Sequence, residues 1–88
     1  MHADVVRIGV SWGTDGRADL RSIDRATAMQ VLYCIDRYLA DRSGDVKKLK
    51  PPRTDFRLRC GDYRVFFDKK AENLIEVTAI RHRREAYR

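Results

Sequence analysis

The sequence predicts an α+β fold in which helices cover one face of a small antiparallel sheet. Within residues 24–41, apolar side chains recur at spacings of three and four, which is typical of an amphipathic helix. Within residues 56–67, apolar and polar side chains alternate on both sides of a two-residue break, which is typical of a β-hairpin. The expected order is one strand, two helices, three strands and a short C-terminal helix, so residues 1–88 are expected to form one domain.

The first half of the chain supplies one strand and both helices. Residues 5–12 are rich in β-branched side chains and predict a strand, residues 13–16 predict a turn, and residues 17–21 predict a short helix. Asp24 is a suitable N-cap for the long helix, which is expected to end near Asp41. Its buried stripe is expected to consist of Ala28, Val31, Leu32, Ile35 and Leu39.

Residues 46–53 are a basic connector between the long helix and the hairpin. Two prolines argue against a strand interior or a helix interior, so a loop is expected here. A charged run of this kind is commonly a solvated loop, but phosphate contacts need little geometric precision, and we also expect its cations to bind RNA. The cations are Lys47, Lys48, Lys50 and Arg53.

The hairpin places three arginines on one side of the sheet. If Gly61 and Asp62 form the loop, Arg59 lies directly opposite Arg64, and Arg57 shares their face. Like charges directly across an antiparallel pair are destabilising, whereas several guanidiniums on one face suit phosphate or carboxylate groups. We therefore predict an open, anion-binding face, although strand arginines also occur as solvated surface residues.

The net charge of +6 is unevenly distributed along the chain. Residues 1–46 hold six Arg against seven Asp, whereas residues 47–88 hold 13 Lys and Arg against six Asp and Glu. The basic excess therefore lies in the half that contains the hairpin. This asymmetry favours a polyanionic partner, most simply a nucleic acid.

The composition also predicts what the protein lacks. No stretch is long and apolar enough to cross a bilayer, and the N-terminus has no pattern of a secretory signal. Cys34 and Cys60 match no metal-ligand spacing, so we expect buried, reduced thiols in a cytoplasmic protein. We accordingly expect no metal, no cofactor and no membrane contact.

The end of the chain adds groups suited to RNA cleavage. A last strand is expected at residues 74–80, followed by a basic tail that forms a helical turn. Cleavage of an RNA phosphodiester needs a base for the ribose 2′-OH, cations for the charge of the transition state, and an acid for the leaving oxygen. Arginines suit the second role, and imidazole exchanges protons readily near neutral pH, although a lone histidine is more often a surface or capping residue. The tail contributes Arg81, His82, Arg83 and Tyr87.

Several short motifs, taken in order, resemble those of the RelE/ParE superfamily, the toxins of prokaryotic type II toxin–antitoxin systems. The upstream segment 18–24 and Leu39 are similar to the helical part of that superfamily. The motifs of the second half are Leu49, Phe56-Arg57-Leu58-Arg59, Gly61-Asp62-Tyr63-Arg64-Val65, Ile80, His82-Arg83 and Tyr87. The likeness covers nearly the whole chain, and its specificity lies in the combination rather than in one motif.

The resemblance implies a microbial-ribonuclease-like RelE fold and a ribosome-dependent endoribonuclease, an mRNA interferase acting in the ribosomal A site beside rRNA. It implies a cognate antitoxin that neutralises the toxin, and contact with operator DNA only through that complex. It assigns Arg57 and Arg59 to binding or polarising the scissile phosphate. Arg64 and Arg81 would stabilise developing charge, and Tyr87 would orient or stack the substrate nucleotide.

One departure from the family pattern and the alternation of the last strand bear on the mechanism. Several members carry lysine at the positions of Arg57 and Arg59, and arginine stays protonated, so it does not readily act as a general base. We therefore expect the base to be His82 or Glu85. Strict alternation along the last strand also places Arg81 on the core side, so its role requires a bulge or strand end that re-aims it.

Fold alone does not decide between activities within this superfamily. ParE-like members inhibit DNA gyrase by binding and perform no catalysis. A toxin without activity, retained as a corepressor with its antitoxin, is a third alternative. The joint presence of the arginines, the histidine and the tyrosine favours the nuclease.

Overall fold

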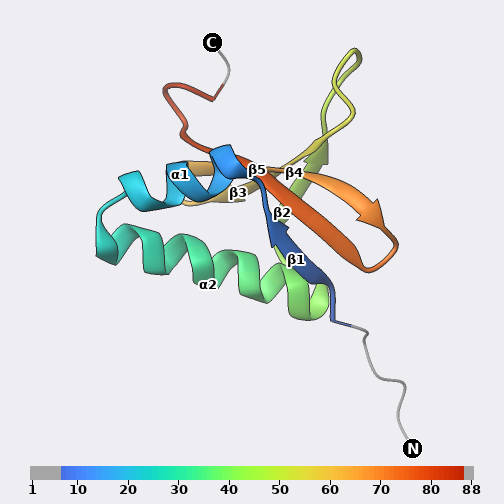
Figure 1. Cartoon of the computed structure of the whole chain (residues 1–88), viewed down its shortest axis with the longest axis horizontal. Helices are drawn as coiled ribbons and strands as arrows, with labels where there is room; N and C mark the ends of the chain where they lie inside the picture. Colours follow the sequence, from blue (N-terminus) through green and yellow to red (C-terminus); the bar gives the residue numbers. More distant parts are fainter. Residues whose placement is uncertain (1–6, 87–88) are drawn as a thin grey trace, which may run out of the picture.

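The protein is an α+β structure with two helices and a five-stranded mixed sheet (Figure 1). The computed structural model describes residues 7–86. Its elements are β1 (Gly9–Trp12), α1 (Thr14–Ser22), α2 (Arg25–Asp41), β2 (Asp45–Lys48), β3 (Phe56–Cys60), β4 (Tyr63–Ala71) and β5 (Leu74–His82). In space the strands are ordered β1-β5-β4-β3-β2.

The expectation of a purely antiparallel sheet is wrong at one edge. The pairs that join β2, β3, β4 and β5 are antiparallel, but β1 runs parallel to β5. Parallel pairing requires a long crossover connection, and both helices and three strands separate β1 from β5 in the chain. The fold class is otherwise as predicted.

The long helix α2 matches its prediction. A carboxylate oxygen of Asp24 accepts a hydrogen bond from the Thr27 N–H at 3.1 Å, which confirms the N-cap, and the helix ends at Asp41. Ala28 and Leu32 lie at the margin of the stripe and are half-buried. The buried residues of the helix are Val31, Ile35, Tyr38 and Leu39.

The first helix begins earlier than the sequence predicts. Residues 13–16 were expected to form a turn, but α1 starts at Thr14. Gly16 lies where the helix meets β5, and a Cβ atom there would be 2.5 Å from the Val77 carbonyl oxygen. This glycine therefore serves close packing rather than a turn. Farther along α1, a carboxylate oxygen of Asp19 accepts a hydrogen bond from the Ile80 N–H at 2.9 Å. This bond satisfies a main-chain donor of β5 past the segment that pairs with β1.

The strand β2 is absent from the sequence prediction. Among the described residues it pairs only with β3, at the edge of the sheet. It ends at Lys48, before Pro51 and Pro52, which lie in the following turn. An edge strand tolerates prolines nearby because one of its sides needs no hydrogen-bond partner. The expected loop is therefore wrong over residues 46–48.

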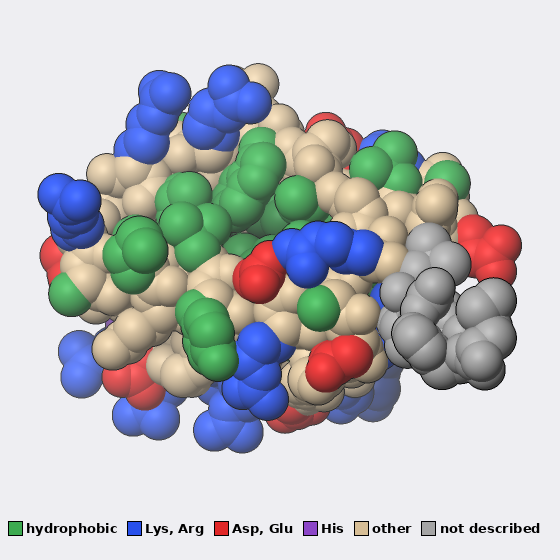
Figure 2. Space-filling view, turned by 90° about the horizontal axis from the view of Figure 1, so that it is seen from below, with side chains coloured by type: hydrophobic (Ala, Val, Ile, Leu, Met, Phe, Trp, Pro, Cys, Tyr) green, Lys and Arg blue, Asp and Glu red, His purple; other side chains and the backbone are tan. Residues whose placement is uncertain are grey.

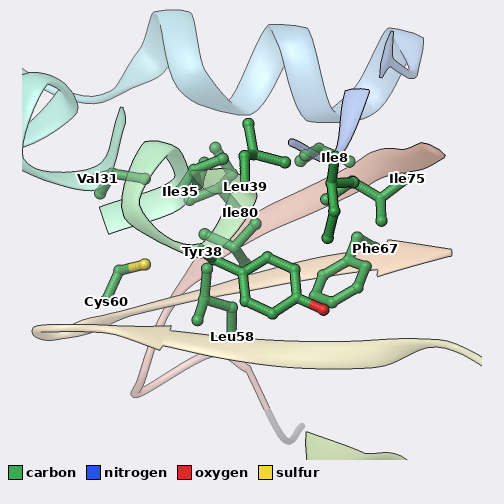
Figure 3. Packing of buried hydrophobic residues seen from close by; sticks show 12 residues of the cluster. Ile8, Val31, Ile35, Tyr38, Leu39, Leu58, Cys60, Phe67, Ile75 and Ile80 are labelled. Atoms are coloured by element: carbon green, nitrogen blue, oxygen red, sulfur yellow. The ribbon is translucent and has the colours of Figure 1, made fainter. Parts of the chain in front are cut away.

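The core lies between α2 and the sheet (Figure 3). The ring of Phe67 is fully buried, and its centroid lies 5.5 Å from those of Tyr38 and Phe56. The largest fully buried side chains are Val31, Leu58, Val65, Phe67 and Val77. Because the helix covers this side of the sheet, polar side chains of the central strands occupy the other side.

A disulfide joins Cys34 of α2 to Cys60 at the end of β3, with Cα atoms 5.9 Å apart. The expectation of two reduced thiols is therefore wrong. The cysteines are 26 positions apart in the sequence, and only the packing of α2 over the hairpin brings them together. The bridge ties the helix to the sheet next to the hairpin turn.

Beyond β5, residues 83–86 form turns, and the Ala86 N–H donates to the His82 carbonyl at 3.1 Å. The expected C-terminal helix is reduced to this single turn within the described residues. Tyr87 lies outside them. Neither α1 nor α2 has the length and apolarity of a membrane span.

Candidate functional site

Three arginines form a row across the sheet. The predicted hairpin register is confirmed, because Arg59 of β3 lies directly opposite Arg64 of β4. Arg64 in turn lies opposite Arg81 of β5. Residues directly opposite each other in antiparallel strands share a face and have Cα atoms about 4.5–5.5 Å apart. We call Arg59, Arg64 and Arg81 the arginine row, and the sheet face that carries them, together with Arg57, the arginine face.

A β-bulge places Arg81 in this row. The pairing of β4 with β5 shifts between Phe66 and Phe67, which pair with Ala79 and Val77, so Thr78 is the extra residue. The shift reverses the alternation that would have placed Arg81 on the core side. The condition stated from the sequence, that a bulge must re-aim this arginine, is met.

Arg64 is buried in the middle of the row. It is only 7% exposed, and its Nη1 donates to the carbonyl oxygens of Gly61 at 2.9 Å and Tyr63 at 3.0 Å. No carboxylate among the described residues pairs with it. Its planar fork is therefore fixed by the main chain of the hairpin, and its charge has no counter-ion within residues 7–86.

A carboxylate lies at each end of the row. Asp45 of β2 lies opposite Arg59, and one of its oxygens is 3.6 Å from Nη2 of Arg57, which is 8% exposed. At the other end, Asp19 of α1 forms an ion pair with Arg81. Sequence reasoning missed Asp45 because it missed β2, whose pairing alone brings this carboxylate to the arginine face. Arg59 is exposed, and its guanidinium has no hydrogen bond or ion pair within the described residues.

The sequence predicted an open arginine face, but the structure shows that this face is not open. Phe66, on the same face, is 2% exposed, and the Arg53 guanidinium lies 4.9 Å from its ring centroid. Arg53 is held by Asp55, with Nε donating to Oδ1 at 3.0 Å. The connector 49–55 and the C-terminal turn both rise on the side of the sheet away from α2 (Figure 1). They border the arginine face.

His82 lies on the opposite face from the arginine row. It pairs with Tyr63, and their rings contact edge to face with centroids 5.4 Å apart. Its Nδ1 accepts the Arg84 N–H at 3.1 Å, so the neutral imidazole carries its proton on Nε2 and presents a donor rather than a base. His82 meets Arg81 only at the strand end, where both line a cavity of about 320 Å³ together with Glu85.

The predicted RNA-binding cations are divided between several surfaces. Lys47 lies opposite Arg57 on the arginine face, whereas Lys48 is on the helix side with its Nζ 5.0 Å from the Phe56 ring centroid. Arg83 lies beside the hairpin turn, with Nε 3.9 Å from a carboxylate oxygen of Asp62. Lys50 is exposed in the connector. Within residues 7–86, no three His, Cys, Asp or Glu side chains are grouped as metal ligands would be.

Comparisons with known proteins decide the family. A comparison with curated proteins finds no match. A family model described as the ParE toxin of the type II toxin–antitoxin system parDE matches residues 10–87. The chain belongs to the RelE/ParE superfamily of type II toxins.

Solved structures of RelE-type toxins share the fold. A chain of the RelBE2 toxin–antitoxin complex from Mycobacterium tuberculosis has a TM-score of 0.78 at 19% identity, over 92% of this toxin and 97% of that chain. A chain of the RelE–RelB complex from Pyrococcus horikoshii has a TM-score of 0.69 at 23% identity, with coverages of 91% and 99%. A chain of the YoeB dimer from Staphylococcus aureus has a TM-score of 0.67 at 14% identity, over 86% of this toxin and 97% of that chain. At these identities the likeness concerns the fold.

Proposed function

We propose that this toxin is an endoribonuclease that cleaves mRNA on the ribosome. The observation that carries the proposal is Arg64, a buried cation that contacts two carbonyl oxygens and no carboxylate of the described residues. A buried charge without a counter-charge is costly. The cost is offset when an anion such as the scissile phosphate completes the row.

In this proposal the arginine row holds the scissile phosphate. The guanidiniums stabilise the extra negative charge that forms as the 2′-oxygen attacks phosphorus and the 5′-oxygen leaves. We assign the general base to Asp45, which lies at one end of the row, is 57% exposed, and approaches Arg57 no closer than 3.6 Å. The carboxylate at the other end, Asp19, is occupied by Arg81 and by the Ile80 N–H. It has less freedom to accept a proton.

The other predicted residues take supporting roles. Lys47 and Arg53 border the arginine face and would contact RNA phosphates on either side of the cleaved bond. Tyr87 keeps the role that the family resemblance implies, which is to orient or stack the substrate nucleotide. In this proposal His82 does not act as the base, because it lies on the helix side of the sheet and its Nδ1 accepts the Arg84 N–H.

A cognate antitoxin is the proposed protein partner. Hydrophobic side chains gather on the α2 side of the molecule, with Lys and Arg side chains around them (Figure 2). These side chains line a groove of about 440 Å³ between β1 and α2. In it, Met29 is 59% exposed and Tyr33 is 67% exposed. An apolar groove on a protein of net charge +6 suits an amphipathic helix of an acidic chain. Operator DNA would be contacted through that complex.

Inhibition of DNA gyrase without catalysis is a second candidate function. It is favoured by one observation, that the matching family model is described as a ParE toxin. The two functions make different demands on the arginine row. A nuclease needs Arg64 for the reaction, whereas a gyrase inhibitor needs a binding surface and no reacting group.

Primer extension on translated messages, after induction of the toxin, tests the proposal. The wild-type protein is expected to cut within codons, and Arg64→Ala is expected to lower cleavage about 10²–10³-fold, the usual effect of removing one transition-state donor. Arg25→Ala, at an exposed position of α2, is the matched control and should cut as the wild type does. The nuclease proposal is refuted if a folded Arg64→Ala protein cuts normally. It is also refuted if the wild type cuts no message and instead blocks supercoiling by purified gyrase.

A further inference from the structure

A second polar cavity lies at the end of the sheet where the hairpin turn meets α2. Its volume is about 570 Å³, within the range of about 300–1,000 Å³ that small-ligand sites occupy. Helix α2, the hairpin and the end of β5 all contribute to its lining. The residues that matter here are Gln30, Cys34, Arg37, Arg59, Tyr63 and His82. The α2 residues and His82 place it on the helix side of the sheet, and Arg59, which belongs to the arginine face, lies between the two.

The charges of this cavity favour an anion. Arg37 and Arg59 both line the cavity, and neither side chain has a hydrogen bond or ion pair within the described residues. Asp41, four positions along α2, interacts electrostatically with Arg37 without forming an ion pair. His82 adds a donor, because its Nδ1 already accepts a main-chain N–H. The acidic residue of the lining, Asp62, is exposed and lies near Arg83. The Arg37 guanidinium and the His82 donor are therefore available to a ligand that accepts hydrogen bonds.

The walls of the cavity are fixed relative to each other. Gln30, Cys34 and Arg37 follow one another at spacings of four and three, which places them on one side of α2. Cys60 forms the opposite wall, and its disulfide to Cys34 joins the two walls directly. A site whose walls are covalently linked loses little conformational entropy when a ligand binds.

We propose that this cavity binds a backbone phosphate of the RNA strand, adjacent to the nucleotide that is cleaved at the arginine row. The inference rests on the proposed nuclease function and extends it to a second contact. Arg59 favours an RNA strand as the ligand, because this residue belongs to the arginine row and also lines the cavity. An RNA strand that passes around the hairpin turn would contact both sites, whereas a free nucleotide bound in the cavity would not need to contact the arginine row.

Binding of a short single-stranded RNA with 2′-O-methyl riboses, which cannot be cleaved, tests this inference. Arg37→Gln is expected to weaken binding about tenfold, as the loss of a charge-assisted contact does. The slope of log K against log salt is expected to fall by about 0.7, the value for one phosphate contact on a single strand. Arg25→Gln, on the same helix but outside the cavity, is the matched control and should bind as the wild type does. Reduction of the disulfide with dithiothreitol should weaken binding by the wild type and leave Arg37→Gln unchanged.

The outcomes separate this inference from the nuclease proposal. If the wild type cleaves mRNA but Arg37→Gln binds RNA with wild-type affinity and salt slope, the cavity is not an RNA site and the nuclease proposal stands. If the wild type cuts no message yet binds RNA through Arg37, the cavity site stands without the nuclease. If adenosine monophosphate displaces the RNA only when Arg37 is present, and at a lower concentration than unlabelled RNA requires, the ligand is a free nucleotide and the assignment to RNA is overturned.

Discussion

Reduction of the disulfide between Cys34 and Cys60 should lower stability by an amount that follows from the length of the loop it closes. The bridge joins positions 26 residues apart, and the loop-closure relation gives about 3.5 kcal/mol for such a loop. One kcal/mol corresponds to about 4–8 °C of melting temperature in a domain of this size. The reduced protein is therefore expected to melt about 14–28 °C below the oxidised protein. Reduction is a cleaner perturbation than substitution, because it leaves both sulfur atoms in place.

Thermal unfolding followed by circular dichroism, with and without dithiothreitol, measures this difference on one preparation. Titration of free thiols in denaturant should find none before reduction and two after it, since the chain has two cysteines and both are bridged. The near-neutral pH and protein concentration are held constant between the two samples. The measured shift then reports the bridge alone.

A variant with Cys34→Ala and Cys60→Ala provides the control. Its melting temperature should not respond to dithiothreitol, which separates the effect of the bridge from any effect of the reagent. The loop-closure reasoning is refuted if the thiol titration shows complete reduction and the reduced wild-type protein still melts within about 2 °C of the oxidised wild-type protein.

Three further predictions concern the site and the helices. Asp45→Asn should lower cleavage about 10²–10⁴-fold, the usual contribution of a general base, while RNA binding is kept or tightened; wild-type cleavage by this variant would exclude the assignment. Hydrogen bonds from the Thr27 side chain and from its N–H lower the pKa of Asp24 below its usual 3.8, so this cap stabilises the fold above pH 3.8. Asp24→Ala should therefore lower the urea midpoint at pH 7, and the gap from wild type should close as the pH falls through the lowered pKa. A gap that stays constant down to pH 2 would contradict the linkage. Gly16→Ala should cost about 1–3 kcal/mol in chemical unfolding, because its Cβ would lie 2.5 Å from the Val77 carbonyl oxygen, and an unchanged midpoint would show that α1 can shift freely.

Local signals explain which parts of the fold were predictable. The hairpin register follows from two loop residues and the alternation on either side, and Gly61 adopts the positive φ of 61° that such a turn favours. The cap at Asp24 and the stripe of α2 are likewise encoded within a few turns of helix. Strand β2 has four residues and depends on its pairing with β3, so no local pattern announces it. The disulfide depends on tertiary packing across 26 positions.

The candidate site was predictable only in part, because one residue decides which face the end of β5 presents. Without the bulge at Thr78, Arg81 would face the core and His82 would join the arginines. With it, Arg81 completes the row and His82 faces α2. A bulge of one residue leaves no clear mark in a sequence of alternating apolar and polar side chains. The missed base candidate, Asp45, has the same kind of cause, because only the unpredicted strand β2 places it beside the row.

The charges along the row argue that Arg64 is the centre of the site. Asp19 compensates Arg81 at one end, whereas neither Arg64 nor Arg59 has an ion pair within residues 7–86. Arg59 is exposed, so Arg64 is the member of the row that is both buried and uncompensated. It is also the least hydrated, since Arg64 is 7% exposed. Salt screens exposed charges over about 8–10 Å but screens buried ones much less. If the proposed function holds, attraction of a phosphate to Arg64 will persist at physiological ionic strength, when contacts with exposed cations at the border of the face have weakened. In the proposed site, the central anion contact would be made by a guanidinium that main-chain carbonyls, rather than flexible side chains, fix in position.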